Sequence, residues 1–172
     1  MNKKQSVIIL TLMAAITTFA ATSFYLKLNN EEGKVYLGHL KYYKNTLNNT
    51  AYFSGPTSCG NLSYIDKSEF PQELLNNYKK INGRGSKPIS LGALEGFFNI
   101  VSLEDAKLIH KNEEQLLRHS NKNLVRLSRV AFNKKESEAL FCLEPLKRGY
   151  LIYMVKEKNE WKLSKGKKAW GH

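Results

Sequence analysis

The chain has 172 residues, which is room for one domain and a leader segment. Hydrophobic residues make up 42% of it and aromatic residues 11%, a content that excludes a disordered chain. Lysine and arginine number 27 against 15 acidic residues, so the formal net charge is +12. A charge of this sign favours either plain solubility or attraction to an anionic surface such as a membrane, a cell-wall polymer or a nucleic acid.

Residues 1–26 predict export. Lys3 and Lys4 precede a long run without any charged residue, and such a run leaves water either in a membrane or in an export channel. Two interpretations remain open, a cleaved signal peptide or an uncleaved anchor in which residues 7–26 cross the inner membrane. Both place residues 27–172 outside the cytoplasm, either periplasmic, secreted or anchored, with 25 basic and 15 acidic residues and a net charge of +10.

Residues 27–67 predict a polar stem followed by a loop region. The Asn-rich stretches LNNEEGK and NTLNNT flank VYLGHLKYYK, which has the length of one short element whose type the pattern leaves open. Glycine and proline interrupt the next stretch, TAYFSGPTSCGNLSYIDK, which predicts a loop or short extended pieces.

The segment SEFPQELLNNYKKING predicts a helix over about residues 69–81. Ser68 is a suitable cap for its start, and Gly83 predicts an end in the left-handed conformation. The apolar positions recur at three- and four-residue steps, which is one helix face. They are Phe70, Leu74, Tyr78 and Ile81.

Two further elements precede the last third of the chain. The run GFFNIV, residues 96–101, has the length and residue types of a buried strand. Ser102 then offers a cap for a helix through LEDAKLIHKNEEQLLRH, whose apolar stripe is broken.

The last third predicts a β-meander. LVRLSRVAF, EALFCLE, YLIYMVKE and EWKLS are four runs of strand length, rich in β-branched and aromatic residues. The connections 133–136 and 157–160 are short, so consecutive strands should pair antiparallel. Strict alternation places Leu124, Val130 and Phe132 on one face. That face needs cover, which the predicted helix at 69–81 can provide.

The predicted fold class is therefore α+β. An antiparallel C-terminal β-meander of about four strands packs with one or two helices behind an N-terminal apolar leader helix. The predicted organisation is a leader or anchor at 1–26, a stem and loop region at 27–67, and an α+β domain at 68–172.

The order of these strands resembles a group of exported bacterial proteins of unknown function. Their pattern is a serine-containing strand ending in Phe-Asn, an Ala-Leu strand, a Gly-led aromatic strand, a Trp strand and a final Trp. The resemblance covers about residues 68–170 and implies export and an α+β fold, but no chemistry. Members often carry a Cys- and Gly-rich link where this chain has CLEPLKRG, with one cysteine only. The positions that carry it are Ser128, Arg129, Phe132, Asn133, Ala139, Leu140, Gly149, Tyr150, Lys156, Trp161 and Trp170.

Several of these positions have a structural interpretation from the residues alone. Asn133 stands at a strand end, where a side-chain amide caps a turn. Ala139 and Gly149 are small enough for a neighbour to pack closely. Trp161 is expected as a core anchor that carries one donor to satisfy.

The two cysteines are the first candidate for chemistry. Outside the cytoplasm Cys59 and Cys142 form either a disulfide or two buried free thiols, and the sequence leaves both open. As a nucleophile, Cys59 in TSCGN would need a histidine base nearby in space. None of the four histidines stands in a recognisable partner motif; they are His39, His110, His119 and His172.

The C-terminal KLSKGKKAW is the second candidate. Its lysines, Lys162, Lys165, Lys167 and Lys168, form the densest basic cluster and are expected either to contact an anionic surface or to lie on a frayed end. Specific nucleic-acid binding is not expected. We predict no catalytic, metal or cofactor-binding residue, because neither metal-ligand spacing nor a Gly-rich phosphate loop occurs.

These observations predict an exported envelope protein, most simply a non-enzymatic binding or interaction domain with a basic surface and an unknown envelope partner. The alternative is a small hydrolase or thiol enzyme that uses Cys59. The leader and the basic surplus favour the first, and only Cys59 beside Gly60 favours the second.

Export has a direct test. Because Lys3, Lys4 and the uncharged run direct the chain outward, protease added outside the inner membrane of spheroplasts should digest residues 27–172. Protection of the whole chain until the cells are lysed would contradict export.

Overall fold

The computed structural model describes eight parts of the chain, and the structural statements below concern these parts. They are residues 31–41, 50–55, 59, 62, 65–83, 91–108, 123–145 and 148–171. The predicted leader at 1–26 lies outside them, as do His110 and His119. None of the helices in these parts is long and apolar enough to cross a membrane.

The described residues form a mixed α/β fold around one seven-stranded sheet. Its strand order is β2-β1-β3-β5-β6-β7, and β4 pairs with β5 outside this path. From β3 onward all pairs are antiparallel, which confirms the predicted meander. β1 pairs in parallel with both β2 and β3, an extension that the sequence did not predict. The strands are β1 (Thr50–Ser54), β2 (Asn99–Ile100), β3 (Asn123–Leu127), β4 (Ala131–Phe132), β5 (Glu138–Pro145), β6 (Arg148–Glu157) and β7 (Glu160–Gly171).

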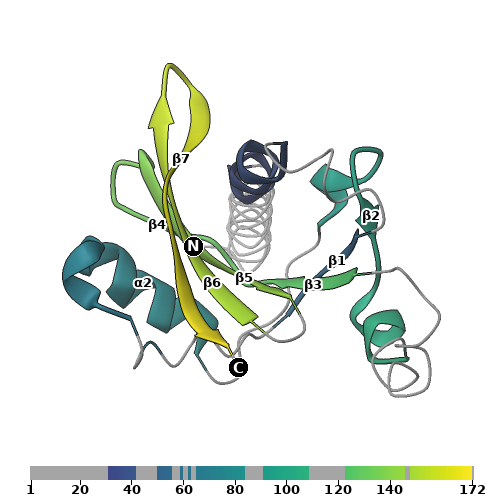
Figure 1. The fold of residues 1–172 in the computed structure, drawn as a ribbon. Helices are drawn as coiled ribbons and strands as arrows, with labels where there is room; N and C mark the ends of the chain where they lie inside the picture. Colours follow the sequence, from purple (N-terminus) through teal and green to yellow (C-terminus); the bar gives the residue numbers. More distant parts are fainter. Residues whose placement is uncertain are drawn as a thin grey trace, which may run out of the picture.

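Helices cover both faces of the sheet. In Figure 1 the helix of residues 31–40, in dark blue, and α2 (Gln72–Asn82) lie on opposite sides of the central strands. A third helical segment spans 103–108, and short 3-10 turns occupy Lys67–Glu69 and Gly92–Leu94. Covering both faces makes three layers, whereas the sequence predicted cover for one face.

The helix of residues 31–40 packs on the first face. The pattern left VYLGHLKYYK without an assigned type within a predicted polar stem, but its first six residues, 35–40, belong to a helix whose inner side is buried. Positions 32, 35, 36, 39 and 40 are buried while 34 and 41 are exposed, which is the spacing of one helix face. This side packs against Phe141, Met154 and Trp161.

Trp161 is buried on the first face with 5% of its surface exposed, as the sequence predicted for a core anchor. Its ring lies 5.8 Å from that of Phe132, and the Lys156 ammonium stands 5.3 Å from the ring centroid. The indole Nε1 has no acceptor among the described residues, so the side chain contributes through apolar and cation–π contacts.

α2 packs on the second face, against β5 and the chain that follows β1. Leu74, Leu75 and Tyr78 are fully buried there with Cys59 and Cys142. The prediction of an apolar face on this helix is therefore confirmed, with Leu75 added to it and Ile81 only half-buried.

The predicted start of α2 is wrong, whereas its predicted end at Gly83 is confirmed in position but not in conformation. The helix begins at Gln72 after Pro71, and Ser68 instead donates from its N–H and its hydroxyl to Asp66. Pro71 occupies the N-cap because its fixed φ of −58° suits the approach to a helix. Gly83 has φ −67° and ψ −179°, which is extended backbone and not the left-handed conformation.

The segment 96–101 is only partly the strand that its apolar run predicted. The strand is limited to Asn99 and Ile100. Gly96 has φ +83° in a turn, and Phe97 is 54% exposed, because the turn directs its side chain away from the core. Ser102 caps the next helix as predicted, since the Asp105 N–H donates to its hydroxyl.

The predicted alternation fails between β3 and β4. Val125 and Leu127 lie on the first face, and so do Val130 and Phe132, but Leu124 lies on the opposite one with Ala51 and Phe53. The phase changes because β3–β4 carries one residue more than β5 across this interval: Leu127 pairs with Leu143 while Ala131 pairs with Leu140. Such an extra residue is a β-bulge.

β7 corrects the expectation of a frayed C-terminus. The strand continues to Gly171, well past the predicted end at Ser164, and pairs with β6 along its length. Two register shifts, opposite Gly149/Tyr150 and Tyr153/Met154, let the twelve residues of β7 pair with the ten residues of β6.

Candidate functional site

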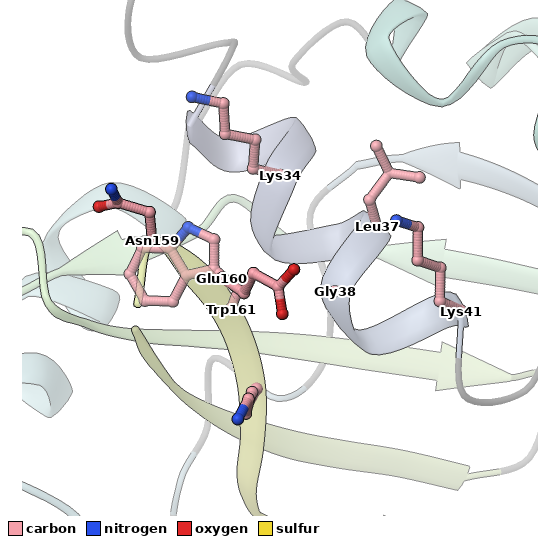
Figure 2. A pocket seen from close by; sticks show the side chains of 8 residues that line it. Lys34, Leu37, Gly38, Lys41, Asn159, Glu160 and Trp161 are labelled. Atoms are coloured by element: carbon pink, nitrogen blue, oxygen red, sulfur yellow. The ribbon is translucent and has the colours of Figure 1, made fainter. Parts of the chain in front are cut away.

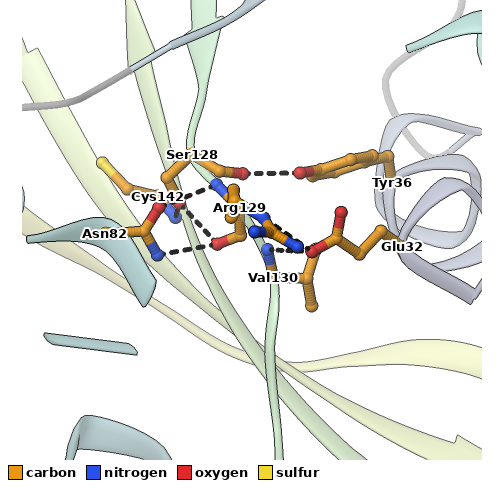
Figure 3. Close-up of polar contacts among 7 residues, drawn as sticks. All are labelled: Glu32, Tyr36, Asn82, Ser128, Arg129, Val130 and Cys142. Carbon is orange, nitrogen blue, oxygen red and sulfur yellow. Dashed lines mark hydrogen bonds and ion pairs between the residues drawn. The ribbon is translucent and has the colours of Figure 1, made fainter. Parts of the chain in front are cut away.

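Among the described residues, the bulge between β3 and β4 brings together the buried polar side chains of Glu32, Asn82 and Ser128, and Figure 3 shows their contacts. Arg129 and Val130 together face Phe141 across the β5 ladder. Their backbone groups cannot all pair with β5, and buried backbone groups need partners. Side chains from both helices supply these partners.

Ser128 makes the bulge possible through its hydroxyl. Its N–H donates to the Cys142 carbonyl, and the Cys142 N–H donates back to Ser128 Oγ at 2.8 Å instead of to the Ser128 carbonyl. That carbonyl is turned away and accepts from the Tyr36 hydroxyl of helix 31–40. The serine side chain thus stands in for its own backbone oxygen, which gives a physical reason for serine at this position.

Asn82 holds the other side of the bulge. Its Nδ2 donates to the Arg129 carbonyl at 2.9 Å, and its Oδ1 accepts from the Arg129 N–H at 2.9 Å. A side-chain amide therefore pairs with one residue as a neighbouring strand would. Two more α2 side chains continue this pairing: Asn77 donates to the Phe132 carbonyl, and Glu73 accepts from the Lys134 N–H.

Glu32 is the buried acid of the network. It is 1% exposed, and its Oε1 accepts from the Val130 N–H and lies 3.5 Å from Arg129 Nε. Burial raises the pKa of Glu32 to about 7, although the Arg129 charge and the Val130 N–H both favour the ionised form. The same burial, helped by the Glu32 charge, raises the pKa of Tyr36 well above its ordinary value.

The structure resolves the question of the two cysteines. Cys59 and Cys142 form a disulfide between the chain that follows β1 and β5, and both are fully buried. A disulfide sulfur is not a nucleophilic thiolate. His39, the histidine of the described residues, contacts Phe141 on the opposite face of the sheet, and burial lowers its pKa to about 4. The thiol-enzyme alternative thereby loses its main support.

The four predicted lysines do not all gather at one place: two of them share one carboxylate, and the other two lie apart from it. Lys165 and Lys167 both pair with Glu69, at 3.1 and 2.9 Å, and these two ammonium groups lower the pKa of that carboxyl. Lys162 pairs with Glu157 near the hairpin turn, and Lys168 stands opposite Tyr150 at the other end of β7. Their contact with an anionic surface stays a prediction.

A pocket of about 500 Å³ lies between helix 31–40 and the β6–β7 hairpin. Lys34, Leu37, Gly38 and Lys41 line it from the helix, and Figure 2 shows these residues beside the hairpin. The hairpin wall consists of Asn159, Glu160, Trp161 and Lys162. Three ammonium groups and one carboxylate thus line a single cavity.

The sequence missed most of these residues for identifiable reasons. No local pattern marks Glu73, Asn77 or Asn82, because each bonds to backbone groups 47 to 61 residues away along the chain. Asn133 was found, because a strand end predicts a cap: its Oδ1 accepts from the N–H groups of Ser137 and Glu138. The apolar residues of segment 31–40 recur at helical spacing, which could have predicted this helix. The Asn-rich stretches on either side favoured a polar stem instead.

The comparisons with known proteins give no further guidance. Neither the protein-family models, nor the curated proteins, nor the solved structures contain a match to this chain. The resemblance to uncharacterised exported proteins accordingly stays a prediction. Within the described residues, no three His, Cys, Asp or Glu side chains come together as a metal-binding group.

Ser128→Ala should lower the free energy of unfolding by about 1–3 kcal/mol, the cost of a buried donor without an acceptor. The Cys142 N–H would lose Ser128 Oγ and have no replacement. Ser164→Ala, at an exposed position of β7, is the control and should change stability by less than about 0.5 kcal/mol. Denaturant unfolding of the three proteins measures this. Equal loss in both variants would contradict the role of the hydroxyl.

Glu32→Gln should change the pH dependence of stability. The pKa of Glu32 rises from an ordinary 4.5 to about 7 on folding, so between these values the folded state holds a proton that the unfolded chain releases. Glu32 therefore stabilises the fold less as pH rises through this window. The wild-type stability relative to the Gln variant should fall by roughly 3 kcal/mol, at about 1.4 kcal/mol for each pKa unit.

Denaturant unfolding at several pH values from 4.5 to 7.5 checks the prediction. His39, whose effect has the opposite sign, is present in both proteins and cancels in the difference. A difference that stays constant across the window would show that Glu32 titrates normally.

Proposed function

We propose that this chain is an exported, non-enzymatic binding domain that contacts anionic groups of the bacterial cell envelope through a basic surface. The observation that carries the proposal is a surplus of exposed lysines without a carboxylate partner among the described residues. They are Lys41, Lys79, Lys80, Lys107, Lys134, Lys135, Lys158 and Lys168.

These lysines lie on helices, turns and the edge strand, so their charge is spread over the surface. Two acids that could neutralise them are engaged elsewhere: Glu69 holds Lys165 and Lys167, and Glu32 is buried beside Arg129. A surface of this kind attracts anions without a shaped site, over a range of about 8 Å at physiological ionic strength.

The location is supported by two independent features. The leader pattern at 1–26 is typical of an exported protein. The buried disulfide between Cys59 and Cys142 favours an oxidising compartment, because cytosolic proteins keep their thiols reduced. The bond closes a separation of 83 residues, which the chain-entropy account values at about 4–5 kcal/mol.

The mature chain should co-sediment with vesicles that contain anionic lipid and release from them as salt rises, because surface attraction is screened. Neutral vesicles should retain little of it. The variant in which Lys162, Lys165, Lys167 and Lys168 are all changed to Gln should bind more weakly at low salt and unfold at nearly the same denaturant concentration.

Equal binding to both vesicle types, or none at low salt, would leave solubility as the whole role of the charge. Changing Lys79 and Lys80 to Gln provides a comparison with changing Lys165 and Lys167 to Gln. Both pairs lose the same charge, but only the second pair is held by Glu69. The α2 pair should therefore contribute more per lysine.

A further inference from the structure

We propose that the pocket between helix 31–40 and the β6–β7 hairpin binds a small organic anion. This inference rests on the proposed binding function and names a ligand class and a place for it. The volume of about 500 Å³ lies within the range of roughly 300–1,000 Å³ that small-molecule sites occupy. Its lining combines cationic and apolar groups, as shown in Figure 2.

The helical wall has the spacing of one helix stripe. Lys34, Leu37, Gly38 and Lys41 follow each other at steps of three, one and three residues, so all four face the hairpin. Gly38 lets the two walls approach, because a Cβ there would lie 2.5 Å from the Trp161 carbonyl oxygen. The close contact at Gly38 fixes the distance between the walls on either side of it.

The hairpin wall is held by a two-residue turn. Lys158 and Asn159 have φ of 48° and 66°, which a tight turn matched to the strand twist requires. The turn places the Asn159 side chain at the rim of the pocket and Glu160 beside it.

The charges of the lining favour an anion. Lys41 is exposed and makes no ion pair among the described residues. Lys34 pairs with Glu31 at 2.7 Å and Lys162 with Glu157 at 2.9 Å, but the lysine side chains are 56% and 45% exposed. Such solvated pairs are weak, and a ligand can share or replace them.

Leu37 and Trp161 add apolar surface to the lining. An inorganic ion would leave this surface unused, whereas a carboxylate, sulfonate or phosphate ester with an apolar body uses both kinds of wall. Among the described residues that line the pocket, Glu160 is the acid, and its charge opposes an anion. Removing its charge should therefore strengthen anion binding, whereas removing a lysine charge should weaken it.

The test is calorimetric titration of the chain as it is recovered from the envelope, in a neutral detergent where the leader is retained. The probe is naphthalene-1-sulfonate, and its matched neutral probe is naphthalene-1-sulfonamide. The sulfonate should bind more tightly, and rising salt should reduce the difference because the contribution is ionic. Equal affinity for the two probes would overturn the inference.

Three single variants locate the site. Lys41→Gln should weaken sulfonate binding about two- to fivefold, the effect of one exposed charge, and Glu160→Gln should strengthen it by a similar factor. Lys168→Gln removes the same charge as Lys41→Gln. Because Lys168 lies six residues beyond Lys162 along β7, about 20 Å away, this variant should not change sulfonate binding. Equal weakening by Lys41→Gln and Lys168→Gln would show attraction by net charge alone and overturn the inference.

The two proposals fail separately. Binding to anionic vesicles without preference for the sulfonate would overturn the pocket inference and leave the basic surface in place. Sulfonate binding that depends on Lys41 and Glu160, without any binding to anionic vesicles, would support the pocket and refute the surface contact.

Discussion

One extra residue in the strand formed by β3 and β4 sets the main constraint on this structure. It leaves the carbonyls of Ser128 and Arg129 and the N–H groups of Arg129 and Val130 without partners on β5. Buried backbone groups of this kind cost several kcal/mol together when they stay unpaired. Tyr36 and Glu32 satisfy them from one face of the sheet, and Asn82 from the other. The bulge therefore fixes the positions of both covering helices through directional bonds, which apolar packing alone does not provide.

α2 has a second role that follows from the same strand. β4 pairs with β5 on one side, and no described strand pairs with its other side. Asn77 and Glu73 take that place by bonding to the backbone of Phe132 and Lys134. A sheet edge covered by a helix is closed to further strands. The apolar face of α2 fills the second core, while its polar residues close the edge, so both halves of its amphipathic pattern have structural partners.

The sequence predicts this fold as far as local pattern reaches. Alternation and short turns located β5, β6 and the start of β7, and the resulting antiparallel pairing is confirmed. The bulge shifts the phase between Leu124 and Val130, and no local pattern marks it, because the signal is the hydroxyl of Ser128 meeting an N–H from a distant strand. The parallel pairing of β1 with β3 joins residues about seventy apart and leaves no trace in either segment. The sequence could not decide between a disulfide and two free thiols for the same reason, because only the distance and orientation of the two cysteines decide it.

The candidate pocket depends on this internal constraint. Helix 31–40 is held on its inner side by Tyr36 and Glu32, which bond to the bulge, and its opposite stripe carries Lys34 and Lys41. A helix fixed by directional bonds holds its outward charges at defined positions relative to the hairpin, whereas an Asn-rich stem would not. Long lysine side chains lose rotamer freedom on binding, so a rigid backbone beneath them reduces what must still be ordered when a ligand enters. The polar network inside the sheet and the basic lining outside it are thus two sides of one short helix, and the first gives the second its geometry.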